Sequence, residues 1–266
     1  MKKKRITDFL KMKEDGEKIT MITAYDATIS RILDDAGVDS ILVGDSLANV
    51  VQGKDDTLSV SLEEMIYHSK MVSRGVSSAH ISTDMPFMSY QVSIEQALEN
   101  AGRLVKEGNA ESVKLEINEE YIETIYAIYK AGIPVVAHIG LCPQSVHVMG
   151  GYKIQGIEED EHERLVDLAK LCEDAGASIL LFEGVPSKLA KEITGLLNIP
   201  TIGIGAGKFC DGQVLVINDL VGLSPDPLPK FVKKYADIKK IISDSVKKYN
   251  KDVKDKKFPS KANIYE

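Results

Sequence analysis

Short apolar runs alternate with longer amphipathic segments along most of the chain. Eight of these runs are rich in Val, Ile and Leu and barely alternate with polar residues, which is typical of strands buried on both faces of a parallel sheet. The eight predicted strands lie at residues 18–26, 40–46, 80–86, 111–116, 133–140, 178–184, 199–207 and 213–219.

Helical patterns fill most of the gaps between these runs. The segment SIEQALENAGRLVKEG begins at a serine that is followed by acids, as helix N-termini often do. Glycine ends this segment and three others that lead directly into the next strand, which predicts a glycine cap at each helix end. These glycines are Gly37, Gly108, Gly132 and Gly176.

Eight strand–helix units in a chain of 266 residues favour a closed (β/α)8 TIM barrel over an open doubly wound sheet. The count favours closure but does not prove it. The gap KFCDG between the last two strands is too short for a full helix, so the seventh helix is expected to be a single turn or absent. Residues before Lys18 and after about Lys230 predict extra N- and C-terminal helices. No linker interrupts the pattern, which predicts one domain over residues 1–266.

The charge balance and the cysteines narrow the class of protein. A formal net charge of -7 argues against general binding to nucleic acid. No apolar run reaches the roughly 20 residues of a membrane helix, and the basic N-terminus lacks the apolar core of a secretion signal. Three widely spaced cysteines, Cys142, Cys172 and Cys210, are read as reduced thiols. These features predict a soluble, cytoplasmic protein.

Polar residues recur where the predicted strands end. Asp45 and Ser46 end the second strand, Asp84 the third, Glu116 the fourth and Glu183 the sixth, and His138 lies near the end of the fifth. The active sites of (β/α)8 barrels lie at the C-terminal ends of their strands. These side chains are therefore expected to meet at one barrel mouth.

A metal site is predicted among these acids. Lys114 and Glu116 are two residues apart on one strand, so their side chains share a face. A lysine and several carboxylates converging on one mouth would be costly without a counter-ion. Asp45, Asp84 and Glu116 offer hard oxygen ligands that suit Mg²⁺, whereas the histidines and cysteines show no spacing for zinc.

Structural alternatives stay open for each of these residues. Asp45 and Ser46 could cap the following turn, and Asp84 precedes a Met-Pro turn and could serve it. Lys114 could extend to solvent, and His138 could be a hydrogen-bonded core histidine. Glu183 is the hardest to explain structurally, because an acid after so apolar a strand needs a partner or a role.

The glycine-rich stretch IGIGAGKFCDGQ matches neither a dinucleotide-binding fingerprint nor a P-loop. A loop at this place in a barrel can hold phosphate. Its glycines could equally admit a flat ligand or a neighbouring backbone. The residues alone do not choose between these readings.

Longer motifs resemble one known family. The stretches TAYDA, VGDSLANVVQG, VKLE, GIPVVAHIGLCPQSV, GGYKIQG, FEGVP, IPTIGIGAG and CDGQVLV are similar to those of ketopantoate hydroxymethyltransferases. The resemblance covers roughly residues 6–229 and rests on long, ordered motifs.

The resemblance implies a (β/α)8 barrel that uses Mg²⁺ and 5,10-methylenetetrahydrofolate to convert 3-methyl-2-oxobutanoate into 2-dehydropantoate, the first committed step of pantothenate synthesis. Family metal ligands fall on Asp45, Asp84 and Glu116. Contacts to the 2-oxoacid fall on Asp45, Ser46, Asp84 and Lys114, with His138 nearby, and the proton acceptor falls on Glu183. The resemblance also implies a homo-oligomer, a decamer built from pentamers.

Four positions depart from the usual family pattern. Ile117 and Asn118 replace two glycines, Met88 replaces another glycine, and Cys142 replaces a threonine. None is a proposed ligand, so the departures bear on loop shape and turnover rate.

Two other functions fit the strand-end acids. One is a Mg²⁺-dependent lyase acting on 2-oxoacids without folate, as in the phosphoenolpyruvate mutase and isocitrate lyase group. The other is an inactive barrel that serves as a scaffold.

Overall fold

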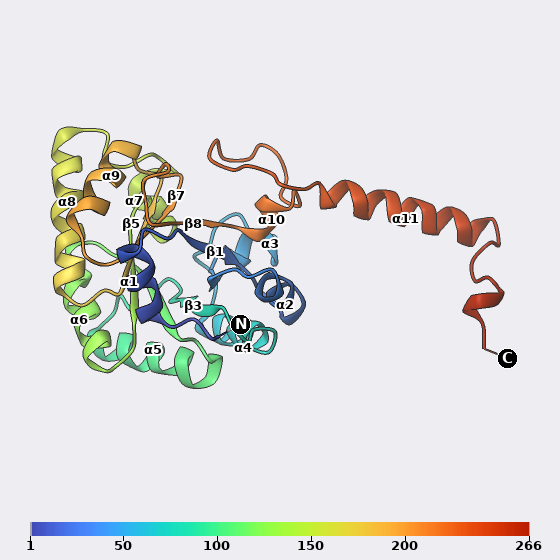
Figure 1. Cartoon of the computed structure of the whole chain (residues 1–266), viewed down its shortest axis with the longest axis horizontal. Coiled ribbons are helices and arrows are strands. Elements are labelled where there is room, and N and C mark those ends of the chain that lie inside the picture. The colour runs from blue at the N-terminus through green and yellow to red at the C-terminus, as the bar shows by residue number, and fades with distance from the viewer. Residues whose placement is uncertain (1, 266) are drawn as a thin grey trace. The chain divides into compact units, whose positions relative to one another are not determined.

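Eight parallel strands close into a barrel in chain order (Figure 1), which confirms the predicted (β/α)8 class. The structure is a computed structural model that describes residues 2–265. The strands are β1 (Ile19–Thr23), β2 (Ser40–Val43), β3 (His80–Asp84), β4 (Ser112–Glu116), β5 (Val135–Gly140), β6 (Ile179–Glu183), β7 (Thr201–Ile204) and β8 (Gly212–Leu215).

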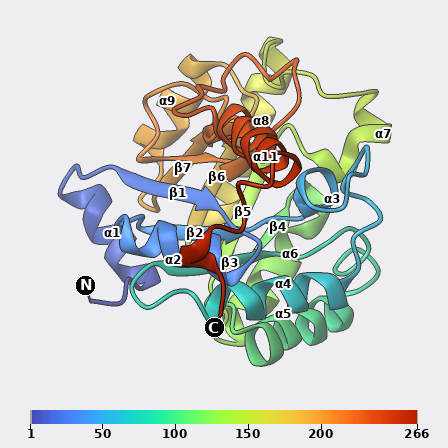
Figure 2. The same ribbon diagram turned by 90° about the vertical axis from the view of Figure 1, so that its right-hand side faces the viewer.

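Helices surround the strands in both ribbon views (Figures 1 and 2). Side-chain caps begin several of them: Asp26 accepts hydrogen bonds from the amides of residues 28 and 29, and Ser61 and Glu64 form a capping box. The helices of the barrel are α1 (Ile6–Glu14), α2 (Ala27–Asp35), α3 (Leu47–Val50), α4 (Leu62–Ser73), α5 (Ile94–Gly108), α6 (Ile122–Lys130), α7 (Val146–Met149), α8 (Glu159–Asp174) and α9 (Ser187–Leu196), with the 3-10 turns η1 (Glu119–Tyr121) and η2 (Pro143–Ser145).

The predicted helix ends are confirmed with one shift. Gly37, Gly132 and Gly176 follow their helices with φ of 85°, 86° and 96°, the left-handed region that glycine enters without strain. At the end of α5, however, Gly108 is still helical, and Asn109 takes the left-handed cap with φ of 58°. Asparagine substitutes for glycine there because its short polar side chain tolerates this conformation.

The connection between β7 and β8 lacks the helix that the other connections contain, as expected from its length. Among the described residues, no helix lies between β7 and β8. The eighth apolar run was predicted to stay extended to residue 219, which is wrong, because β8 ends at Leu215 and the helix α10 (Ile217–Leu220) begins two residues later. An apolar run by itself does not mark where a strand ends.

Helix α1 packs against the N-terminal ends of the strands. Its Phe9 and Met12 belong to the same buried cluster as inward residues such as Ile19 of β1 and Val214 of β8. Lys13 on the same helix contacts the segments that precede β7 and β8, through the carbonyl of residue 199 and the Asp211 carboxylate, each at 3.0 Å. The end of the barrel opposite the predicted site is thereby covered.

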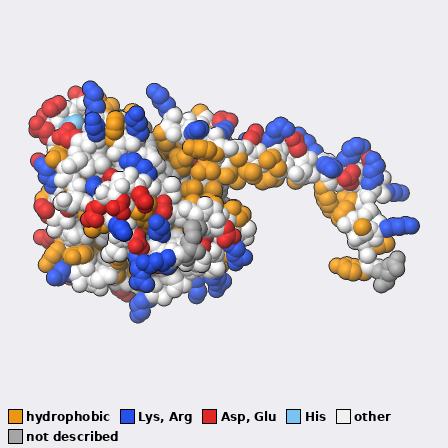
Figure 3. Space-filling view, viewed as in Figure 1, with side chains coloured by type: hydrophobic (Ala, Val, Ile, Leu, Met, Phe, Trp, Pro, Cys, Tyr) orange, Lys and Arg blue, Asp and Glu red, His pale blue; other side chains and the backbone are white. Residues whose placement is uncertain are grey.

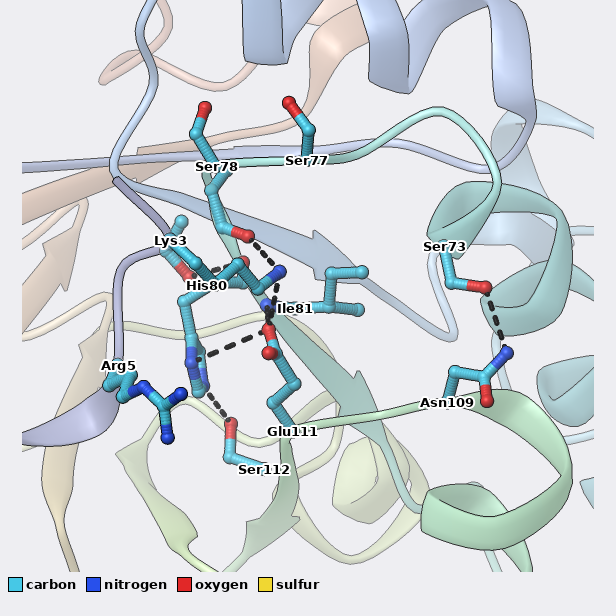
Figure 4. A network of polar contacts seen from close by, with 12 residues as sticks. Lys3, Arg5, Ser73, Ser77, Ser78, His80, Ile81, Asn109, Glu111 and Ser112 are labelled. Atoms are coloured by element: carbon cyan, nitrogen blue, oxygen red, sulfur yellow. Dashed lines mark hydrogen bonds and ion pairs between the residues drawn. The ribbon is translucent and has the colours of Figure 1, made fainter. Parts of the chain in front are cut away.

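A polar network ties β3 and β4 together at this same end (Figure 4). The buried His80 ring has Nε2 2.9 Å from Ser112 Oγ and Nδ1 3.8 Å from Glu111 Oε2. Glu111 also accepts a hydrogen bond from the Ile81 amide at 2.8 Å and pairs with Lys3 at 2.9 Å. Burial lowers the pKa of His80 to about 4, with Glu111 opposing and Lys3 adding to the effect, so the ring is neutral at pH 7.

The chain divides into two compact units, residues 1–216 and residues 217–266. The second unit contains α10, α11 (Ile238–Lys254) and the 3-10 turn η3 (Lys261–Asn263). Among its described residues, α11 buries none of its side chains, and hydrophobic side chains such as Ile241, Ile242 and Tyr249 are exposed along it (Figure 3). The expectation of a single domain stays a prediction.

No helix within residues 2–265 has the length and apolar character needed to span a bilayer.

Candidate active site

The side chains singled out from the sequence lie at or directly after the C-terminal ends of five neighbouring strands. Asp45 and Ser46 follow β2, Asp84 ends β3, Lys114 and Glu116 lie on β4, His138 on β5, and Glu183 ends β6. Strand register places Asp84 beside Lys114 and Glu116 beside His138. Asp45, Asp84, Lys114, Glu116 and His138 are each at most 5% exposed.

Lys114 lies in the middle of this group. Its Nζ is 3.1 Å from Asp84 Oδ1 and 3.4 Å from His138 Nδ1. Burial by itself would lower the pKa of Lys114, but the carboxylates of Asp84, Asp45 and Glu116 outweigh it and raise that pKa above its usual value. Lys114 is therefore a fixed positive charge at neutral pH.

His138 is a neutral ring between Lys114 and Glu183. Burial and the Lys114 charge both lower the pKa of His138 well below its usual value. An ammonium can only donate, so the hydrogen bond from Lys114 makes Nδ1 the acceptor and assigns the ring proton to Nε2. That Nε2 lies 3.6 Å from Glu183 Oε2, too far for a hydrogen bond, so the imidazole stands between the lysine and the glutamate.

Glu183 is the most accessible carboxylate of the group, with its side chain 22% exposed. Burial raises the pKa of Glu183 to about 7; Lys114 opposes the rise, and the negative charges of Asp45 and Asp84 add to it. A carboxylate with a pKa near neutrality accepts protons far better than an ordinary surface glutamate. The position and basicity of Glu183 suit a general base.

Asp45 and Ser46 are held by neighbours in the same mouth. The Asp45 amide donates to Asp84 Oδ2 at 3.0 Å, and the Tyr25 hydroxyl lies 2.9 Å from Ser46 Oγ. Tyr25 is buried, and burial raises the pKa of its hydroxyl well above the usual value, so it stays protonated.

The predicted metal ligands share one end of the barrel but do not form a ready-made ligand group. Within residues 2–265, no three His, Cys, Asp or Glu side chains are arranged to hold an ion. Asp45 Oδ2 and Glu116 Oε2 each accept a hydrogen bond at 2.9 Å, and Asp84 faces Lys114.

The donor set nevertheless fits a divalent cation. One lysine, Lys114, is close enough to four carboxylates to interact with their charges: those of Asp45, Asp84, Glu116 and Glu183. Burial, with the neighbouring acids, raises the pKa of Asp84 to about 7 and that of Glu116 well above its usual value, although Lys114 opposes both shifts. Such an excess of buried oxygen donors over positive charge is what a hard cation such as Mg²⁺ neutralises.

One residue of the site, Gln144, was missed by the sequence reasoning. It lies in the turn η2 after β5, is 5% exposed, and donates hydrogen bonds to both Asp45 and Glu116. The only signal for it was its place in the motif GLCPQSV, because a neutral amide has no spacing rule that marks it as functional.

Two glycines of the stretch that begins in β7 lie against neighbouring chain segments. A Cβ on Gly207 would lie 2.2 Å from Ser187 Oγ, and one on Gly212 would lie 2.6 Å from the Ile19 carbonyl oxygen. Close approach of neighbouring chain segments therefore accounts for these two glycines.

The four departures from the family pattern have local structural consequences. Met88 has a φ of 64°, which is the backbone conformation that glycine usually occupies. Asn118 caps η1 by accepting a hydrogen bond from the Glu120 amide at 3.0 Å, and Ile117 is buried. Cys142 is a buried free thiol next to Pro143 of η2.

Sequence comparisons with known proteins give one consistent family. A family model described as ketopantoate hydroxymethyltransferase matches residues 3–261. A 3-methyl-2-oxobutanoate hydroxymethyltransferase of Clostridium novyi (strain NT) is 52% identical over 263 residues, covering 99% of this chain and 96% of the relative. A protein of the same name from Geobacter metallireducens is 52% identical over 264 residues, covering 99% of each chain.

Solved structures share the fold at low sequence identity. Phosphoenolpyruvate phosphomutase from Streptomyces platensis subsp. rosaceus aligns with a TM-score of 0.63 at 13% identity, covering 94% of this chain and 88% of that one. A 2,3-dimethylmalate lyase of the PEP mutase/isocitrate lyase superfamily aligns with a TM-score of 0.59 at 18% identity, covering 79% of each chain.

Proposed function

The chain belongs to the ketopantoate hydroxymethyltransferase family of enzymes, and from that premise we propose that it moves a hydroxymethyl group from 5,10-methylenetetrahydrofolate to 3-methyl-2-oxobutanoate. The product is 2-dehydropantoate, a precursor of pantothenate. The observation that carries the proposal is the placement of Glu183, with its pKa raised to about 7, across His138 from the buried Lys114 and the acids around it. A base, a fixed positive charge and oxygen donors for a cation are the groups that enolisation of a 2-oxoacid requires.

Asp45, Asp84 and Glu116 are the residues proposed to hold Mg²⁺. The bound ion would act as a Lewis acid on the carboxylate and 2-oxo group of the substrate, which makes the proton on C3 more acidic. Lys114 is proposed to bind the anionic oxygens of the same substrate. Ser46 and His138 are proposed to contact the substrate beside it.

Glu183 is proposed to take the proton from C3. The resulting carbanion forms a carbon–carbon bond to the methylene carbon carried by the folate, and one water supplies the hydroxyl group while tetrahydrofolate leaves. In a variant of this step, formaldehyde released from the folate is the species attacked. His138 lies beside Glu183, with its Nε2 3.6 Å from the carboxylate.

The first test is proton exchange at C3. The protein is incubated with 3-methyl-2-oxobutanoate in D₂O, without folate, and the C3 proton signal is followed by NMR with Mg²⁺ and with EDTA. We expect exchange that requires the metal, because enolisation precedes the one-carbon step. An absence of exchange both with Mg²⁺ and after addition of tetrahydrofolate would sink the proposal and favour an inactive barrel.

A second arm separates the transferase from a folate-independent lyase, whose group shares this fold. The full reaction is run with 5,10-methylenetetrahydrofolate, with formaldehyde alone, and with neither. We expect 2-dehydropantoate from the folate arm. Exchange of the C3 proton without formation of 2-dehydropantoate in any of the three reactions would indicate a different enzyme that enolises 2-oxoacids.

We also propose a homo-oligomeric, cytoplasmic enzyme. The exposed hydrophobic side chains of α11 support association, because a helix that buries no side chain gains little from folding alone. The three cysteines are free thiols, as expected in a reducing compartment. Light scattering coupled to gel filtration measures the mass in solution, and a monomer at micromolar concentration would contradict the assembly.

A further inference from the structure

Gln144 makes hydrogen bonds to two of the proposed metal ligands. Its side-chain Nε2 donates to Asp45 Oδ2 at 2.9 Å, and its backbone amide donates to Glu116 Oε2 at 2.9 Å. Asp45 follows β2 and Glu116 ends β4, and these two strands are separated by β3. Gln144 reaches both from the turn η2 that follows β5.

The orientation of the Gln144 amide is fixed by its partners. Nε2 faces two acceptors, the Asp45 carboxylate and the Met85 carbonyl oxygen at 3.0 Å. Oε1 faces the Tyr90 hydroxyl at 2.8 Å. A reversed amide would place Oε1 against both acceptors, which is unfavourable in a buried site.

Tyr90 completes this arrangement. Its hydroxyl accepts a hydrogen bond from the Glu116 amide at 3.2 Å and donates to Gln144 Oε1 at 2.8 Å, a shorter contact than the 3.2 Å to the Glu116 carbonyl oxygen. Gln144 is therefore held at both ends of its amide.

We propose, on the basis of the proposed function, that Gln144 is a positioning residue that preorganises Asp45 and Glu116 for the divalent cation. Two carboxylates in a buried site repel each other, and a neutral donor that bonds to both lowers this cost without cancelling the charge that attracts the ion. It acts on Asp45 through its side chain. It acts on Glu116 through a backbone amide whose place depends on the side-chain anchors at Tyr90 and Met85. Partners of metal ligands commonly have this role.

The test measures binding of Mn²⁺ alone, without substrate, by electron paramagnetic resonance. Gln144→Met keeps the length of the side chain but removes the amide. We expect it to weaken Mn²⁺ binding roughly 10- to 100-fold, as loss of a partner of metal ligands usually does. A folded variant whose Kd stays within about threefold of the wild-type value, well below that loss, would overturn the inference.

Gln91→Met is the matched control. The Gln91 amide donates to Gln144 Oε1 at 3.2 Å, and no hydrogen bond joins it to Asp45 or Glu116. We expect its Mn²⁺ affinity to stay near that of the wild type. An equal loss in both variants would overturn the specific role of Gln144, because general loosening of the loop would then explain the effect.

Tyr90→Phe keeps the test decisive if Gln144→Met does not fold. It leaves Gln144 in place, keeps the ring packed edge-on against Tyr121, and removes only the hydroxyl. We expect a smaller weakening of Mn²⁺ binding in the same direction. Unchanged affinity in this variant would overturn the inference as well.

Activity supplies a second readout. If Gln144 acts through the cation, raising the Mg²⁺ concentration should restore C3 proton exchange in Gln144→Met to near the wild-type maximum. A rate that stays low at saturating Mg²⁺ would overturn the positioning role. If the wild-type protein itself fails to bind Mn²⁺ or to exchange the proton, the proposed function is refuted. If the wild type does both and Gln144→Met behaves in the same way, only the role of Gln144 is refuted.

Discussion

Asp34 is expected to stabilise the end of the barrel opposite the active site. Its carboxylate lies at the end of α2 and is 3% exposed. Oδ2 accepts from the Ser77 amide and hydroxyl at 2.9 and 2.7 Å. Oδ1 accepts from the Ser78 amide and hydroxyl at 3.0 and 2.8 Å and from the Ala79 amide at 2.6 Å. These bonds hold the segment that leads into β3, which ends in Asp84.

Replacing Asp34 with Asn is the perturbation. If the amide group takes the place of Oδ1, the buried backbone N–H groups of residues 78 and 79 face a donor; if it takes the place of Oδ2, the Ser77 backbone N–H loses its acceptor. In either orientation, hydrogen bonds to a charged acceptor, worth about 1.5–3 kcal/mol each, are lost or become bonds to a neutral acceptor. We therefore expect the free energy of unfolding to fall by about 2 kcal/mol at pH 7, which lowers Tm by roughly 4–8 °C.

The stabilisation by Asp34 is also expected to depend on pH, in a direction set by its pKa. Burial alone would raise the pKa of Asp34, but the hydrogen bonds from Ala79, Ser77 and Ser78 outweigh it and hold the pKa well below 3.8. A carboxyl whose folded-state pKa is depressed stabilises the protein fully above its unfolded pKa and loses that stabilisation as pH falls toward the folded value. The difference between wild type and Asp34→Asn should be constant from pH 5 to 8. It should shrink by roughly 1 kcal/mol at pH 3.

Urea unfolding at pH 7, 5, 4 and 3 measures these differences. Asp35→Asn is the matched control, because the neighbouring Asp35 is exposed, and such a surface change is expected to alter stability by less than about 0.5 kcal/mol. C3 proton exchange at 25 °C should be unchanged in Asp34→Asn, since the change is at the far end of the barrel. A stability loss under about 1 kcal/mol at pH 7, or a difference that does not shrink in acid, would refute the reasoning.

Three further predictions concern the site and the network in Figure 4. Glu183→Gln should slow C3 proton exchange by about 10²- to 10⁴-fold, the usual value of a general base, while Mn²⁺ binding is retained; normal exchange would remove Glu183 from this role. Lys114→Met should lower kcat/KM for the 2-oxoacid roughly 10- to 100-fold by removing a charge-assisted hydrogen bond, and an unchanged kcat/KM would contradict this. The pKa of His80 is lowered from 6.5 to about 4, so the neutral buried ring makes its full contribution to protein stability above pH 6.5 and loses it as pH falls toward 4. Between pH 7.5 and 5, urea unfolding should therefore show wild type losing about 2 kcal/mol relative to His80→Gln, and parallel pH profiles would count against it.

Much of the architecture followed from local patterns. Apolar runs that barely alternate arise because both faces of a parallel strand are buried, and each such run appeared as a strand of the barrel. The shared direction of Lys114 and Glu116 followed from the two-residue repeat of a strand, and both side chains are buried in the same mouth. Strand-end acids could be found because polar residues after apolar runs stand out in any sequence.

The rest depended on contacts between residues far apart in the chain. Closure of the barrel depends on pairing between β1 and β8, which no local pattern encodes. The neutrality of His138 and the raised pKa of Glu183 come from burial and from neighbouring charges on other strands. Gln144 could not be chosen from residue type, since its importance lies in reaching Asp45, 99 positions away in sequence. The sequence by itself determined the strands, the helices and the rim that carries the acids. Only the tertiary structure decided the charge state and the hydrogen-bond partner of each group, because both depend on the distance between side chains that folding brings together.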